Sequence, residues 1–252
     1  AQNITLQADK NAIAVNGGTI AASGTATLKG QSVSVSGGEL SAASAALTAS
    51  TENIALNSGS IAANEVTLTA TKGAISEVDG FALSAPVLNT SAAGATTLLS
   101  KANQLEQVNI TEAGGSVTIG SANSKNSNAL QVITDEQING DLTVTNYDDE
   151  SGENNAILVS KSLQAAGDVI LINEEAAITV NSGAALACYD VALGAKTAMT
   201  INGSVNATRD ASLSSGAGMT INGNVSATRD ASLKSSAGMS IIGDVTAGND
   251  AS

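Results

Sequence analysis

The feature that most constrains this chain is a repeat of twenty residues near its C-terminal end. Residues 199–218 read MTINGSVNATRDASLSSGAG and residues 219–238 read MTINGNVSATRDASLKSSAG, so the two copies differ at only four positions. Residues 239–252 begin a third copy. A period of this length is typical of a solenoid, because a unit this small cannot bury its apolar face alone and must stack on its neighbours.

A looser form of the same repeat occupies the N-terminal part of the chain. Residues 13–15 (IAV) return at 33–35 (VSV) and at 54–56 (IAL), which is a spacing of 20 or 21. Alternation of apolar and polar residues indicates short strands, and Gly, Asn, Asp and Ser separate them as turn residues. We therefore predict an all-β fold, a right-handed parallel β-helix (solenoid) of about 12 coils of roughly 20 residues.

The regularity of the repeat divides the predicted solenoid into three stretches. Residues 1–75 form regular coils, residues 76–165 form coils with polar insertions, and residues 166–252 form the most regular repeats. The two insertions cover Ser121–Asn128 and Asn146–Asn155. We expect one continuous solenoid from which these two loops project.

The composition argues against several classes of function. The net charge of −13 does not suit nucleic acid or an anionic membrane surface, and no apolar run is long enough to span a membrane. The chain has no His and one Cys, so it contains neither a Ser/His/Asp nor a Cys/His catalytic set. We expect no enzymatic activity and no cofactor, and we expect Cys188 to fill a turn or the core, with an intermolecular disulfide or a nucleophile as alternatives.

An acidic loop is the first candidate site. Its carboxylates could offer the hard oxygen ligands that Ca²⁺ prefers, although their spacing does not match an EF-hand. We expect an acidic loop in contact with solvent, with calcium binding as the alternative. The candidate ligands are Asp148, Asp149, Glu150 and Glu153.

Charged and amide residues that recur every twenty residues are the second candidate. In a stack they would form columns in which Arg and turn N–H groups offset the repulsion between carboxylates, and in which amides bond from coil to coil. We interpret them as structural ladders, with a column of bound Ca²⁺ as the alternative. The residues are Asp190, Asp210, Asp230, Asp250, Arg209, Arg229, Asn202 and Asn222.

The repeats also resemble those of a known family. The segment Gly167–Leu171 (GDVIL), followed by Ala177–Val180 (AITV) and then by the MTINGxVxAxxDASL units, resembles the shaft of filamentous-haemagglutinin-like exoproteins. This family is secreted by two-partner systems of bacteria with an outer membrane and includes adhesins and the stalks of contact-dependent inhibition toxins. The resemblance implies a rigid scaffold and transfers no binding residue to this chain.

These observations predict a structural shaft segment of a large secreted or cell-surface bacterial adhesin. A subunit of a self-assembling extracellular fibre and the stalk of a contact-dependent inhibition toxin are alternatives. A polysaccharide-active enzyme is less favoured, because the chain has only two Tyr and one Phe to hold sugar rings. The expected partners are coils of the same longer chain, end-to-end copies, or ligands on host or bacterial surfaces.

Overall fold

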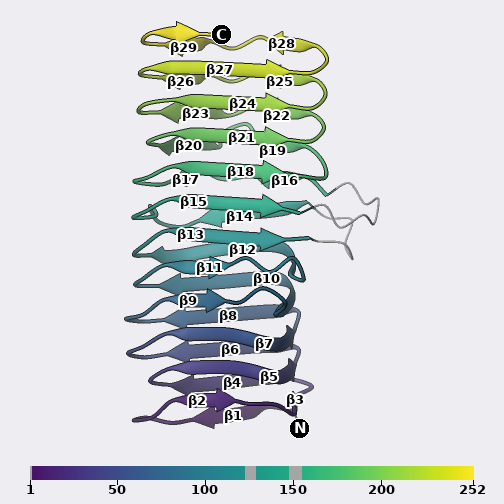
Figure 1. Cartoon of the computed structure of the whole chain (residues 1–252), viewed down its shortest axis with the longest axis vertical. Helices are drawn as coiled ribbons and strands as arrows, with labels where there is room; N and C mark the ends of the chain where they lie inside the picture. The colour runs from purple at the N-terminus through teal and green to yellow at the C-terminus, as the bar shows by residue number, and fades with distance from the viewer. Residues whose placement is uncertain (1, 123–128, 148–154) are drawn as a thin grey trace. The chain divides into compact units, whose positions relative to one another are not determined.

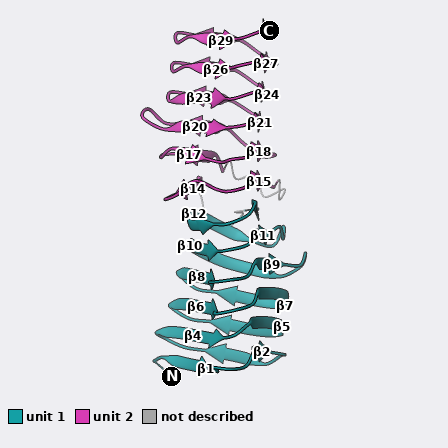
Figure 2. Ribbon diagram, turned by 90° about the vertical axis from the view of Figure 1, so that its left-hand side faces the viewer, with its two compact units in different colours: residues 1–123 teal, residues 124–252 magenta. Residues whose placement is uncertain are grey.

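The computed structural model describes residues 2–122, 129–147 and 155–252, and every regular element in these ranges is a β-strand. The chain forms two compact units, residues 1–123 and 124–252 (Figure 2). In each unit parallel strands stack turn upon turn (Figure 1). The fold is thus a parallel β-solenoid, and its described turns number about 11, close to the 12 expected.

Unit 1 (residues 1–123) has three sides, and each side is a ladder of parallel strands. The first ladder contains β1 (Ile4–Gln7), β4 (Thr25–Gly30), β6 (Ser44–Ala49), β8 (Glu65–Ala70) and the C-terminal parts of β10 (Ala82–Ala92) and β12 (Gln104–Ala113). The second contains β2 (Ile13–Val15), the first parts of β5 (Val33–Ser41) and β7 (Ile54–Ala62), and β9 (Ile75–Glu77), β11 (Thr96–Leu98) and β13 (Val117–Ser121). The third contains β3 (Thr19–Ala21), the second parts of β5 and β7, and the first parts of β10 and β12.

The core of unit 1 consists of columns in which like residues stack on like. Leu28, Leu47 and Leu68 are register partners in adjacent strands, and all three side chains are fully buried. Burying a leucine stabilises the fold by about 1.5–3 kcal/mol. Successive side chains of a strand point to opposite faces, so the residues between the buried ones face outward. Each turn therefore needs only two or three apolar positions per side.

One glycine shows how closely the turns of unit 1 approach each other. Gly59 has a φ of +104°, and a Cβ at this position would collide with the backbone carbonyl of Gly38 one turn earlier. A β-bulge interrupts the register between β5 and β7 at this point. Glycine is required here both for its conformation and for the space.

Unit 2 (residues 124–252) also has three ladders. The first contains β15 (Leu142–Asn146), β18 (Val169–Asn173), β21 (Val191–Ala195), β24 (Ala211–Ser215), β27 (Asp230–Ser235) and β30 (Asp250–Ala251). The second contains β14 (Leu130–Thr134), β16 (Ile157–Val159), β19 (Ile178–Val180), β22 (Met199–Ile201), β25 (Met219–Ile221) and β28 (Met239–Ile241). The third contains β17 (Leu163–Gln164), β20 (Ala185–Cys188), β23 (Ser204–Ala207), β26 (Val225–Ala227) and β29 (Val245–Ala247).

The twenty-residue repeats of unit 2 pair residue for residue. Met199, Met219 and Met239 are successive register partners, as the repeat predicts for turns of equal length. Earlier turns of the unit differ in length, because Gln164 pairs with Ala187 at a separation of 23 residues. Parts of both polar insertions, residues 123–128 and 148–154, lie outside the described residues.

Candidate functional site

An aspartate ladder runs along unit 2 at the N-terminal ends of β15, β18, β21, β24 and β27. The backbone N–H of Asp168 donates to Asp141 Oδ1 (2.9 Å), and that of Asp190 donates to Asp168 Oδ1 (3.1 Å). The pattern continues from Asp210 to Asp190 (3.0 Å) and from Asp230 to Asp210 (3.3 Å). Each carboxylate therefore accepts a charge-assisted hydrogen bond from the next turn and satisfies a donor that the strand ladder leaves unpaired.

Two arginines neutralise part of this ladder. Arg209 Nε donates to Asp190 Oδ1 (2.9 Å), and its Nη2 contacts the other oxygen of the same carboxylate. Arg229 forms the same bidentate pair with Asp210, with Nε 2.7 Å from Oδ1. Each Arg Nε also lies near the Asp beside it in sequence, 3.4 Å from Asp210 Oδ2 and 3.3 Å from Asp230 Oδ2. The hydrogen bond from Arg229 lowers the pKa of the Asp210 carboxyl. Because the side chains of Arg209 and Arg229 are 40% and 51% exposed, dissolved salt screens both ion pairs.

The other predicted ladder residues also come together. Asn222 Nδ2 donates to Asn202 Oδ1 at 2.7 Å, which is the predicted amide contact between successive turns. Asp250 is the register partner of Asp230 across β27 and β30. These contacts are structural in kind, since each joins one turn to the next.

Sequence reasoning missed the two lower rungs of the aspartate ladder, Asp141 and Asp168. They lie 27 and 22 residues before the next rung, so a search at twenty-residue spacing does not find them. The available signal was local, because each aspartate directly precedes the first residue of a strand, as Asp190 does.

The candidate calcium ligands of the acidic loop lie outside the described residues; they are Asp148, Asp149, Glu150 and Glu153. Within residues 2–122, 129–147 and 155–252, no group of three or more His, Cys, Asp or Glu side chains is arranged to hold a metal ion.

The single cysteine ends β20, and an aromatic ring follows it in the turn before β21. Arg209 packs over the ring of Tyr189, with its guanidinium carbon 4.6 Å from the ring centroid. Cys188 is buried and unpaired, and its Sγ lies 3.0 Å from the carbonyl oxygen of Asp190. Burial raises the pKa of the Cys188 thiol to about 11, so the thiol stays protonated at neutral pH.

A buried polar cluster in unit 1 is the least expected feature. Glu77 is the register partner of Leu56 in a core column, and only 8% of it is exposed. Its Oε2 accepts hydrogen bonds from Ser100 N (2.9 Å) and Asn103 Nδ2 (2.8 Å), while its Oε1 is buried with no partner among the described residues. Burial raises the pKa of Glu77 to about 7, the two hydrogen bonds oppose the rise, and Asp79 adds to it.

Asn173 in unit 2 is a second buried polar residue, but its groups are satisfied. Its Nδ2 donates to the carbonyls of Asn155 (2.9 Å) and Ala177 (2.8 Å). Its Oδ1 accepts from the backbone N–H groups of Glu175 (3.0 Å) and Ala176 (2.8 Å). The side chain therefore fixes the turn between β18 and β19.

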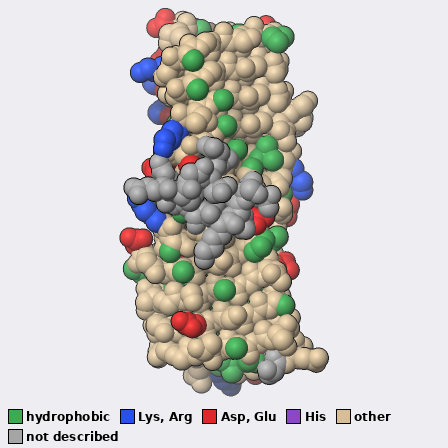
Figure 3. Space-filling model, turned by 90° about the vertical axis from the view of Figure 1, so that its right-hand side faces the viewer, with side chains coloured by type: hydrophobic (Ala, Val, Ile, Leu, Met, Phe, Trp, Pro, Cys, Tyr) green, Lys and Arg blue, Asp and Glu red, His purple; other side chains and the backbone are tan. Residues whose placement is uncertain are grey.

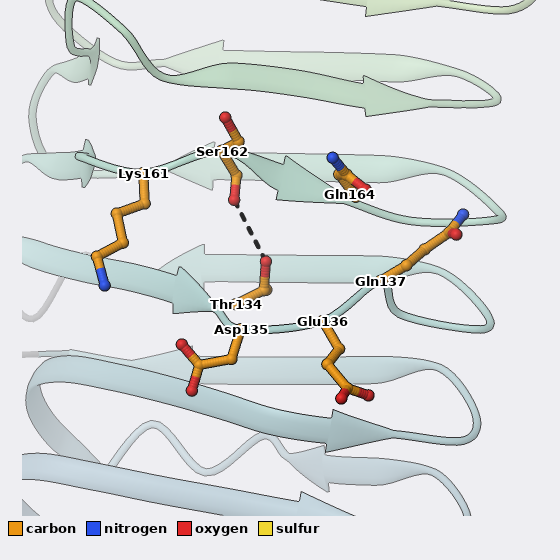
Figure 4. Close-up of a pocket in the computed structure, with 7 residues that line it drawn as sticks. All are labelled: Thr134, Asp135, Glu136, Gln137, Lys161, Ser162 and Gln164. Atoms are coloured by element: carbon orange, nitrogen blue, oxygen red, sulfur yellow. Dashed lines mark hydrogen bonds between the residues drawn. The ribbon is translucent and has the colours of Figure 1, made fainter.

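Unit 2 also has a polar hollow of about 270 Å³ on its surface, shown in Figure 4. Residues 134–137 line it from one turn, and Lys161, Ser162 and Gln164 line it from the next. Thr134 Oγ1 donates to the Ser162 carbonyl (3.3 Å) between these turns. Asp135 and Glu136 point the same way, away from Ser162, so the acidic groups lie at one margin of the hollow (Figure 4).

The face drawn in Figure 3 shows no broad apolar area outside its grey atoms. Hydrophobic side chains appear there as small separate spots among polar atoms, with acidic and basic groups scattered along the edges (Figure 3). In the part of the chain that the structure describes, no helix could cross a membrane.

The fold and contacts define the chain as a parallel β-solenoid stabilised by side-chain ladders. Comparison with protein-family models, curated proteins and solved structures finds no match. The likeness to filamentous-haemagglutinin-like repeats therefore stays a prediction from the sequence.

Proposed function

We propose that this chain is a structural shaft segment, a rigid spacer within a large secreted or cell-surface adhesin of a bacterium with an outer membrane. The observation that carries the proposal is the residue-for-residue pairing of the twenty-residue copies, as in Met199, Met219 and Met239. Such a structure adds length by adding turns of one kind, at about 4.8 Å per turn, and each turn contacts only its neighbours.

The surface ladders support a spacer role. Asp, Arg and Asn side chains join successive turns along unit 2 by hydrogen bonds and ion pairs. Contacts between turns therefore lie on the outside of the stack as well as in its core. A spacer must resist bending, and contacts on the periphery of a stack oppose bending more effectively than contacts on its axis. The secreted location rests on the resemblance of the repeats and on the acidic composition.

Rigidity can be measured between two outward positions of the first ladder of unit 2. Thr143, Ile170, Ala192, Ser212 and Ser232 are successive register partners, so four strand spacings, about 19 Å, separate the ends of this series. Spin labels on Thr143→Cys and Ser232→Cys, in a chain with Cys188→Ala, should give one narrow distance distribution in pulsed electron paramagnetic resonance. A broad distribution would contradict a rigid spacer.

The fibre alternative makes a different prediction for the purified chain. A shaft segment should appear in negative-stain micrographs as particles of one length, whereas a self-assembling subunit should form end-to-end polymers of many lengths. Polymers that lengthen with protein concentration would replace the spacer proposal with the fibre.

A further inference from the structure

A second hollow adjoins the one in Figure 4 and extends it along unit 2. It has a volume of about 350 Å³ and shares Gln137 and Gln164 with the first hollow. From these shared residues it continues over the outer face of β17, β20 and β23, as far as Asn206 and Thr208. The two hollows together form one surface depression, here named the glutamine groove, which crosses several turns parallel to the stacking direction.

The groove exists because one small residue interrupts a column of amides. Gln164, Ala187 and Asn206 are successive register partners, and all three lie at outward positions between buried neighbours. The two amides are two strand spacings apart, about 10 Å, with the methyl group of Ala187 between them. A ligand resting on Ala187 could therefore bond to an exposed amide on either side.

An aromatic ring stands at the same place. Tyr189 lines the second hollow, is 45% exposed, and is held from the next turn by Arg209. Few aromatic residues exist in this chain, and their scarcity argued against a sugar-binding groove. One of the only two tyrosines nevertheless lies at the groove, fixed in position beside exposed amides.

The chemistry of the groove selects for an uncharged ligand rich in hydroxyl groups. Amides and hydroxyls can both donate to and accept from neighbouring sugar hydroxyls, and an aromatic ring can pack on the apolar face of a pyranose. The strand spacing of about 4.8 Å is close to the length of one pyranose in an extended chain, so successive turns can meet successive sugars. Asp135 and Glu136 at one margin outnumber Lys161, the one cation in the lining of the two hollows, and together with the net charge of −13 they disfavour acidic glycans.

A peptide ligand fits less well. Extended peptides gain most of their affinity by pairing their backbone with an unpaired strand edge. The glutamine groove lies on the face of β17, β20 and β23, whose edges are already paired with each other. We propose that the glutamine groove binds a neutral oligosaccharide lying along the solenoid, with Gln164 and Asn206 as hydrogen-bonding groups and Tyr189 as the stacking ring.

The proposal can be tested by titrating the whole chain with neutral hexasaccharides (cellohexaose, xylohexaose and chitohexaose) and with an acidic one, hexagalacturonate, in a calorimeter. We expect saturable binding of at least one neutral hexasaccharide and weaker or no binding of hexagalacturonate. Ala187→Gln fills the groove at an outward position whose register partners are already Gln164 and Asn206, so the variant should fold and lose at least tenfold in affinity. Tyr189→Ala should also lose at least tenfold.

Ser226→Ala is the matched control, because Ser226 is the register partner of Asn206 one turn further and does not line either hollow. It should bind like the unmodified chain. Absence of binding to every neutral hexasaccharide would overturn the proposal, and so would a preference for the acidic one. If Ala187→Gln bound the hexasaccharide as tightly as the unmodified chain, the binding site would lie outside the glutamine groove, which would overturn the proposal. Any of these results would leave the spacer proposal intact, since rigidity does not depend on the groove.

Discussion

Replacing Glu77 with glutamine should remove a pH dependence from the stability of unit 1. The carboxyl titrates near pH 7 in the folded chain and near 4.5 in the unfolded chain. The folded state therefore holds the proton more tightly, so the stability from this group is complete below pH 4.5 and is lost as the pH rises through 7. At about 1.4 kcal/mol per pH unit, the loss above pH 7 is roughly 3 kcal/mol.

Glutamine keeps the shape of the side chain and cannot ionise. Its oxygen can accept the hydrogen bonds from Ser100 N and Asn103 Nδ2 that Glu77 Oε2 accepts. Between pH 5.5 and 8, the unmodified chain should lose about 2 kcal/mol of local stability, and Glu77→Gln should lose none of it. The variant should therefore be more stable than the unmodified chain at both pH values, by about 1.4 kcal/mol at pH 5.5 and by about 3 kcal/mol at pH 8.

Hydrogen–deuterium exchange read by mass spectrometry suits this test, because solenoids can open locally rather than in one step. Protection factors for peptides that cover residues 95–110 should fall between pH 5.5 and 8 in the unmodified chain only. Glu52→Gln controls for the loss of one negative charge, because Glu52 is exposed in the same unit. The same fall in protection in Glu77→Gln as in the unmodified chain would show that another group causes the pH dependence.

Three further predictions concern single positions. Asn173→Ala should lower the free energy of unfolding, measured by denaturant titration, by about 2–4 kcal/mol, because it leaves buried backbone groups unpaired. Asn222→Ala, at an exposed position, should lower it by less than about 1 kcal/mol. Equal losses in the two variants would contradict the importance of burial. Gly17→Ala should lower the free energy of unfolding by about 1 kcal/mol, because Gly17 has a positive φ and open space around it. Gly59→Ala should cost about 1–3 kcal/mol more, because its Cβ would also meet the backbone carbonyl of Gly38. A smaller loss at Gly59 than at Gly17 would show that the turns separate easily. Cys188 should react with iodoacetamide at pH 8 only in urea, and rapid labelling of the folded chain would show that its turn opens.

The sequence was sufficient to predict the solenoid. In Val33-Ser34-Val35 and its copies, alternation, spacing and turn residues all favour short stacked strands, and the fold follows because such strands have no other way to bury their apolar side. The columns of Asp and Arg residues in the C-terminal repeats could also be predicted from the sequence, because residues at equal spacing in turns of equal length become neighbours.

The buried cluster and the glutamine groove could not be predicted in the same way. Glu77 takes the column position of Leu56, and a carboxylate gives no sequence signal that it is buried. The groove depends on turns of unequal length, because Gln164 and Ala187 are 23 residues apart while Ala187 and Asn206 are 19 apart. A search at a fixed spacing does not align these three residues, and only the register brings them side by side.

Lengthening the stack tests the central claim most directly. If each twenty-residue copy is one turn of a rigid spacer, three extra copies of residues 199–218 inserted after Gly218 should add three turns. Small-angle X-ray scattering should then show a maximum dimension larger by about 14 Å, with the radius of gyration of the cross-section unchanged. An unchanged maximum dimension, or a wider cross-section, would contradict the account.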